Sequence, residues 1–184
     1  MAQGLLPFLY IEEKKTGATA LAGLPVYLEL AQVIGLSKSV HKHLKVREGE
    51  QGWTDSQMII SLVLLNLAGG DCVDDLKVLE KADGFCRVLC KMETHGLKRK
   101  IRRALESRWR KEKRRSVPSA SAVFRYLAAF HDVDQEKQRQ AGKAFIPSPN
   151  AHLRELWEVN KDLVAFSQTR NPQSTATVDT DATL

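Results

Sequence analysis

The stretch from Thr54 to Leu67 places the strongest constraint on how this chain can fold. Thr54 and Gln57 have the spacing of a capping box, in which each side chain pairs with the backbone N–H of the other residue, so a helix should begin here. The residues that follow are apolar almost all round that helix: Met58, Ile59, Ile60, Leu62, Val63, Leu64, Leu65 and Leu67. A helix without a polar face belongs in the centre of a bundle. The sequence therefore predicts a helical domain built around this segment.

Further helices are predicted on both sides of the central one. Upstream, Pro25 favours a helix start, and apolar residues recur at helical spacing up to Gly35, namely Val26, Leu30, Val33 and Ile34. The polar stretch 41–52 is interpreted as a loop or a poorly packed helix. Downstream, Gly69-Gly70 should end the central helix and Asp71 should cap the next one. A third short helix is expected after Asp83-Gly84, closing at Gly96.

In the second half of the chain, the sequence predicts two more helices after the basic segment 98–115. Ser116–Ser119 should break the chain before a helix that runs to about Phe130, with Val123, Phe124 and Leu127 facing inward. Residues 131–149 form a polar connector that contains prolines. Asn150 should then cap a long amphipathic helix whose apolar residues are Leu153, Leu156, Trp157, Leu163 and Val164.

The last ten residues, Thr175–Leu184, are rich in threonine and follow a turn-like Asn171–Ser174, which is typical of a β-strand. Period two places Asp179 and Asp181 on the same face of that strand. Two close carboxylates repel each other unless a cation lies between them. From spacing alone, a solvated edge strand or a polar tail is the favoured interpretation. One strand cannot complete a sheet, so we expect it to begin an incomplete domain.

The positive charge of the chain is concentrated in one segment. Residues 98–115 contain eleven Lys or Arg and two Glu, an excess of +9, while the whole chain carries +6, so the remainder sums to −3. This segment has a thin apolar stripe (Ile101, Ala104, Leu105, Trp109), and Arg99, Arg103, Arg110 and Arg114 point away from that stripe if it is helical. A solvated surface helix usually mixes charges of both signs, so contact with a polyanion such as DNA is the favoured interpretation.

Composition narrows the class of protein. An apolar content of 43% supports a packed core, and no apolar run approaches the roughly twenty residues that span a bilayer. Three cysteines cannot all pair, which favours a reducing cytosol. We therefore expect a cytoplasmic protein without a membrane partner, and contact of the basic segment with DNA would associate it with the nucleoid.

Two clusters could hold a metal or carry catalysis. Cys86 and Cys90 lie four residues apart with His95 beyond, but no fourth ligand has a standard spacing, so core cysteines are the favoured interpretation. His131-Asp132 with Asp134 is explained as well by a helix end followed by a capping residue.

With these segments placed, the sequence resembles the N-terminal part of a bacterial insertion-sequence transposase of the DDE, RNase-H-like type. The resemblance covers essentially the whole chain and is carried by the order and spacing of its motifs rather than by any one of them. These motifs are Thr19–Leu24, Leu67–Gly70 with Asp74-Asp75-Leu76 and Leu79, Val117–Ser119 leading into Val123–Leu127, and Val178–Thr183.

The resemblance implies two parts: a helical DNA-binding domain at 1–149 containing the basic helix 98–115, and a linking helix with the first strand of an RNase-H-like domain at 150–184. It implies binding to the terminal inverted repeats of a mobile element, and it gives Asp181, in an Asp-x-Thr context, the role of first acidic ligand, with Asp179 as the weaker candidate. Mg²⁺ would require two more carboxylates from further downstream, so we expect no metal and no catalysis from this chain as given.

Other functions remain open. A basic helical regulator could occupy the ends of the element without catalysis, or a protein–protein module could dock its basic helix on an acidic partner. A homodimer is compatible with any of these.

Overall fold

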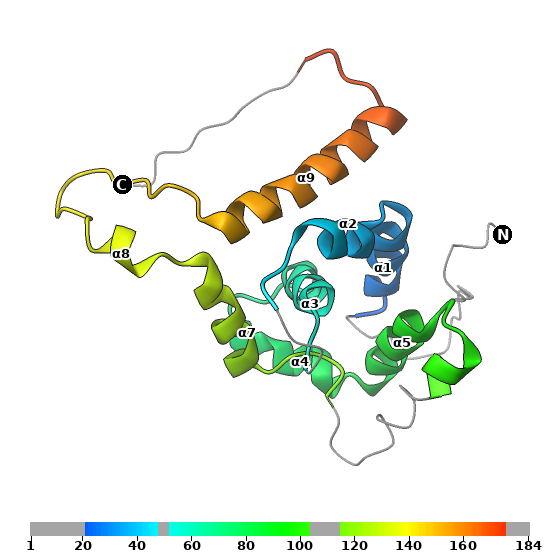
Figure 1. Cartoon of the computed structure of the whole chain (residues 1–184). Helices are drawn as coiled ribbons and strands as arrows, with labels where there is room; N and C mark the ends of the chain where they lie inside the picture. The colour runs from blue at the N-terminus through cyan, green and yellow to red at the C-terminus, as the bar shows by residue number, and fades with distance from the viewer. Residues whose placement is uncertain (1–20, 48–51, 104–114, 176–184) are drawn as a thin grey trace.

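The computed structural model describes residues 21–47, 52–103 and 115–175, and this part of the chain is helical without a β-strand. The mainly helical class is therefore confirmed for these residues (Figure 1). The helices are α1 (Leu24–Val33), α2 (Leu36–His43), α3 (Asp55–Leu67), α4 (Leu76–Lys81), α5 (Asp83–Thr94), α7 (Ala120–Leu127), α8 (Val133–Glu136) and α9 (Ala151–Arg170), with short 3-10 turns η1 (Val73–Asp75) and η2 (Ala128–Phe130). The predicted C-terminal strand, with Asp179 and Asp181, lies outside the described residues.

Helix α3 lies at the centre of the bundle, as predicted (Figure 1). Its N-terminus forms the capping box: Gln57 N–H donates to Thr54 Oγ1 at 3.2 Å, and Thr54 N–H donates to Gln57 Oε1 at 3.0 Å. Met58 and Leu64 are almost fully buried, whereas Val63 is 40% exposed. The helix is thus enclosed on most of its circumference but not on all of it.

Helices α1 and α2 form a hairpin against α3. Pro25 lies in the first turn of α1, and Gly35 adopts a left-handed conformation (φ +72°) that allows the chain to turn directly into α2. The side of α1 that packs inward carries Leu24 and Leu28. The apolar residues on its other side are exposed: Val26, Leu30 and Val33. Helix α2 occupies residues 36–43, so the polar stretch 41–52, interpreted as a loop or a poorly packed helix, begins with the end of a packed helix.

The structure of the segment after α3 differs from the prediction at one helix cap. Gly69 ends α3 with φ +76°, as expected, but Asp71 does not cap the next helix. Instead, the carboxylate of Asp75 accepts hydrogen bonds from the N–H groups of Asp71 (3.1 Å) and Cys72 (3.2 Å). These bonds, the one from Cys72 first, hold the pKa of Asp75 below its usual value.

Helix α7, which follows the predicted break at Ser116–Ser119, begins and ends where expected. Fewer of its apolar residues face the core than the sequence predicts. The Ser119 side chain caps α7 by accepting from Ala122 N–H at 3.2 Å, and η2 extends the helical run to Phe130. Val123 is fully buried, whereas Phe124 (57%) and Leu127 (37%) are exposed. The prediction that the latter two face inward is wrong, because only Val123 and Tyr126 of α7 enter the core.

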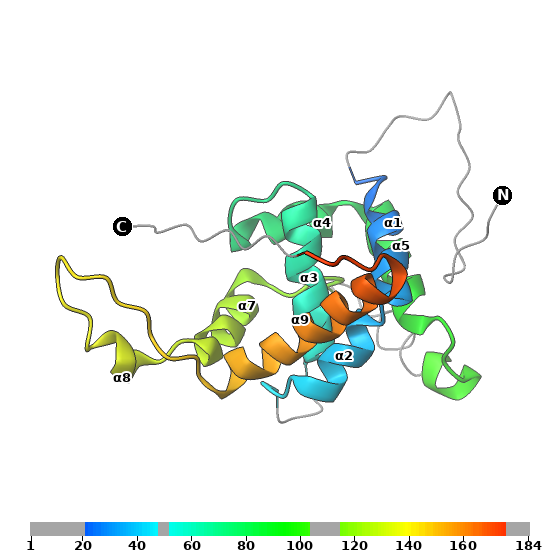
Figure 2. The same ribbon diagram turned by 90° about the horizontal axis from the view of Figure 1, so that it is seen from above.

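Helix α9 begins at the predicted cap, since Asn150 Oδ1 accepts from Leu153 N–H at 2.9 Å. It lies across α2, and Figures 1 and 2 both show the two helices side by side. Ser39 Oγ donates to Asp162 Oδ2 at 2.7 Å, and His43 Nε2 lies 3.0 Å from the same oxygen. Helix α8 and the rest of the connector project to one side of the bundle (Figure 2).

The Asp162 contacts predict a pH-dependent loss of stability. The hydrogen bond from Ser39, followed by the one from His43, lowers the pKa of Asp162 below its usual 3.8. The stabilisation is therefore fully present above about pH 4, near the unfolded-state pKa, and is lost as the pH falls through the lowered pKa of the folded state. Replacing Asp162 with Asn should weaken the decline of urea stability below pH 4. Glu158→Gln, on the same helix and paired with exposed Lys161, is the matched control. An unchanged acid limb in Asp162→Asn would contradict this prediction.

Candidate nucleic-acid interface

A basic surface lies at the C-terminal end of α5 and on the residues that follow it. It consists of Arg87 and Lys91 on α5, and Arg99, Arg102 and Arg103 at the start of the next helical segment. The chain turns between these two parts at Gly96, whose φ of +73° favours glycine. Just before this turn, the buried Thr94 Oγ1 donates to the carbonyls of Cys90 (3.0 Å) and Lys91 (3.2 Å), which closes the end of α5.

Part of the basic surface is hollow. A pocket of about 460 Å³ is lined by Lys91, Thr94, His95, Gly96, Arg99, Arg102 and Arg103. None of the described residues that line it is Asp or Glu. Lysine and arginine side chains gathered around one hollow make its electrostatic potential positive, and a positive potential attracts anions. The arrangement is therefore suited to bind phosphate groups.

The structure describes two of the four predicted DNA-binding residues. Arg99 and Arg103 lie together on the pocket, whereas Arg110 and Arg114 lie outside the described residues. Sequence reasoning missed Arg87 and Lys91, which belong to the preceding helix. Their four-residue spacing on one helix face, shortly before the basic segment, was the signal that could have identified them.

Glu80 fixes the chain where it returns from the basic segment to the core. Both of its carboxylate oxygens accept from Ser116 N–H at 3.0 Å, and Oε2 also accepts from Val117 N–H at 3.0 Å. Val117 is fully buried directly after this contact. The chain is thus held against α4 at Ser116 and Val117, directly after the basic segment.

Removing the Glu80 carboxylate should lower stability. Glu80→Ala leaves the Ser116 and Val117 N–H groups without their acceptor, and hydrogen bonds to a charged group are each worth about 1.5–3 kcal/mol. We expect a loss of about 2 kcal/mol in the free energy of unfolding measured with urea. Glu80→Gln keeps one acceptor oxygen and should lose less. A Glu80→Ala variant that is as stable as wild type would show that these bonds contribute nothing.

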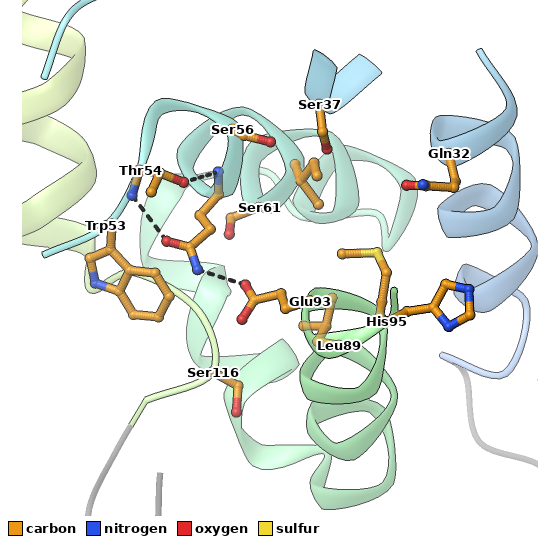
Figure 3. A pocket seen from close by; sticks show the side chains of 13 residues that line it. Gln32, Ser37, Trp53, Thr54, Ser56, Ser61, Leu89, Glu93, His95 and Ser116 are labelled. Carbon is orange, nitrogen blue, oxygen red and sulfur yellow. Dashed lines mark hydrogen bonds between the residues drawn. The ribbon is translucent and has the colours of Figure 1, made fainter. Parts of the chain in front are cut away.

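A second pocket, of about 400 Å³, lies between α3 and α5 (Figure 3). Trp53 stands at one end and His95 at the other, with Glu93 between them (Figure 3). Gln57, the capping-box residue, donates through Nε2 to Glu93 Oε1 at 2.7 Å. The walls combine hydroxyl groups with apolar side chains, namely Ser37, Ser56, Ser61, Ile60, Leu89 and Met92. His95 also lines the basic pocket, so the two hollows meet at this residue.

The two clusters considered from the sequence have local structural roles. Cys86 is half-buried, with Sγ 3.4 Å from the carbonyl oxygens of Leu79 and Glu80, and burial raises the pKa of its thiol. Asp132 caps α8 through the N–H groups of Asp134 and Gln135, which lower the pKa of its carboxyl. Within residues 21–47, 52–103 and 115–175, no group of three or more His, Cys, Asp or Glu side chains could hold a metal ion. The predicted metal ligand Asp181 and its alternative Asp179 are outside these ranges.

Comparison with protein families, with characterised proteins and with solved structures found no match for this chain. In the part of the chain that the structure describes, no helix is both long and apolar enough to cross a membrane.

Proposed function

We propose that this chain binds double-stranded DNA through the basic surface. The observation that carries the proposal is the hollow formed by Lys91, Arg99, Arg102 and Arg103, with no carboxylate among its described lining residues. Neutralising phosphates with lysine and arginine releases the counterions condensed on DNA, and this provides most of the affinity of sequence-independent binding. Helix α7, which follows the basic segment, carries one long basic side chain, Arg125, and so offers little for contact with base edges. We therefore expect the basic surface to contact the phosphate backbone more than the bases.

The experiment that tests this proposal compares two polyanions. Binding of a short blunt duplex is measured by fluorescence anisotropy beside binding of polyglutamate at equal ionic strength. Duplex DNA carries a higher linear charge density, so the protein should bind it more tightly. Equal or tighter binding of polyglutamate would reject DNA as the partner and favour a module that docks on an acidic protein.

The more specific proposal is that this DNA is the terminal inverted repeat of an insertion element, and that the chain is the end-binding portion of a DDE transposase. It rests on the resemblance of the sequence motifs. In that enzyme, Asp181 would contribute one carboxylate to a Mg²⁺ site, and the ions would activate the attacking water and hydroxyl groups. An Asp and a Glu on further strands encoded downstream of Leu184 would support the transposase, and an immediate stop codon would support a non-catalytic regulator.

A further inference from the structure

The hollow in the basic surface takes its cations from two segments that are not collinear (Figure 1). Lys91 lies in the last turn of α5, whereas Arg99 and Arg103 lie on the segment that follows the turn at Gly96. The positive φ of Gly96 allows the chain to change direction there. The positive charges therefore converge on one hollow instead of forming a row along one helix.

The shape of this hollow favours a terminal group over the middle of a strand. The end of α5, the turn at Gly96 and the segment after it all border its volume of about 460 Å³. A phosphodiester within a DNA strand continues into a nucleotide on both sides, so it can lie along the rim but cannot enter end-on. A phosphate monoester is attached through a single oxygen, so it can enter the hollow.

Charge favours the same group. A phosphate monoester carries a charge of about −1.5 to −2 at pH 7 and has three acceptor oxygens, whereas each phosphodiester of DNA carries a single negative charge. The guanidinium group of arginine can donate to two phosphate oxygens at once, and lysine adds a compact positive charge. Lys91, Arg99 and Arg103, with no carboxylate among the described lining residues, therefore suit a monoester.

We propose that the hollow binds a terminal phosphate monoester among Lys91, Arg99 and Arg103, while Arg87, outside the hollow, contacts phosphodiesters of the same duplex. The inference rests on the proposed function, because a duplex brings its end to the hollow only if the basic surface binds DNA. The monoester belongs either to the 5′ end of a DNA strand or to a free mononucleotide. Both sources present the same phosphate chemistry.

The test compares three blunt duplexes by fluorescence anisotropy at one salt concentration. The first has hydroxyl ends, and the second is identical but carries a single 5′-phosphate. The third has hydroxyl ends and one more base pair, which adds about the same charge as the 5′-phosphate. Wild-type protein should bind the phosphorylated duplex about tenfold more tightly than either of the others, in line with one additional hydrogen bond to a charged group.

Single substitutions separate the hollow from the rest of the basic surface. Arg99→Gln and Arg103→Gln should each lose most of the gain from the 5′-phosphate, because each removes a guanidinium group that borders the hollow. Arg87→Gln is the matched control, since it removes the same charge from the basic surface outside the hollow. It should weaken the binding of all three duplexes and keep the ratio between them.

Thymidine 5′-monophosphate and thymidine, measured by equilibrium dialysis without DNA, distinguish the two sources. A preference for the monophosphate that Arg103→Gln abolishes identifies a free nucleotide, and a gain confined to the duplexes identifies a strand end. No preference for a monoester in either arm, or an unchanged gain in folded Arg99→Gln and Arg103→Gln, would overturn the inference. The hydroxyl-ended duplex reports separately on the proposed function: if it does not bind, DNA binding is rejected, and the dialysis arm still tests the hollow.

Discussion

Replacing Leu64 with Ala should lower the free energy of unfolding by about 3 kcal/mol. Its side chain is 1% exposed at the centre of α3, so truncation loses the transfer energy of the removed groups and leaves a cavity among well-packed neighbours. Urea unfolding followed by circular dichroism measures the effect. The slope of the transition should stay unchanged, because the folded bundle remains equally compact.

Val63→Ala is the matched control, since it truncates the neighbouring residue of the same helix where the side chain is 40% exposed. Its cost should stay below about 1 kcal/mol, because less apolar area returns to water. Equal losses at the two positions would mean that α3 is not the centre of the core. A Leu64→Ala midpoint within error of wild type would contradict the account of the fold.

The second large effect is expected at the basic surface. Replacing Lys91, Arg99 and Arg103 together with Gln should weaken binding to any duplex, because three phosphate contacts are lost. Discrimination between sequences should change less, since phosphate contacts position the protein and base contacts specify the site. The control is a second triple variant, Lys38→Gln, Lys143→Gln and Arg154→Gln, which removes the same charge from exposed positions elsewhere.

Local signals in the sequence predicted much of the fold correctly. The capping box at Thr54, the caps at Ser119 and Asn150 and the helix end at Gly69 depend on bonds within a few residues, so the sequence contains both partners. Which face of a helix is buried depends on neighbours distant in the chain. That is why Phe124 was expected in the core, although α7 buries only its Val123 and Tyr126 side.

The same limit applies to the candidate site. The charge excess at 98–115 led to the prediction of Arg99 and Arg103. The spacing of Arg87 and Lys91 marks a basic helix face, but only the packing shows that Lys91 lines the same hollow. The pairs Glu80–Ser116 and Ser39–Asp162 join residues far apart in the sequence, and Gln57–Glu93 links two helices. None of these contacts follows from hydrophobic periodicity, because each depends on how the helices pack.

The salt dependence of duplex affinity tests most directly whether the basic surface binds DNA phosphates. For wild type, the logarithm of the association constant should fall linearly with the logarithm of salt concentration. In the Lys91, Arg99 and Arg103 triple variant that slope should be flatter by up to about 0.9 for each lost contact, while the control triple should keep it nearly unchanged. A folded Lys91, Arg99 and Arg103 variant with the wild-type slope would show that these cations touch no phosphate and would contradict the account.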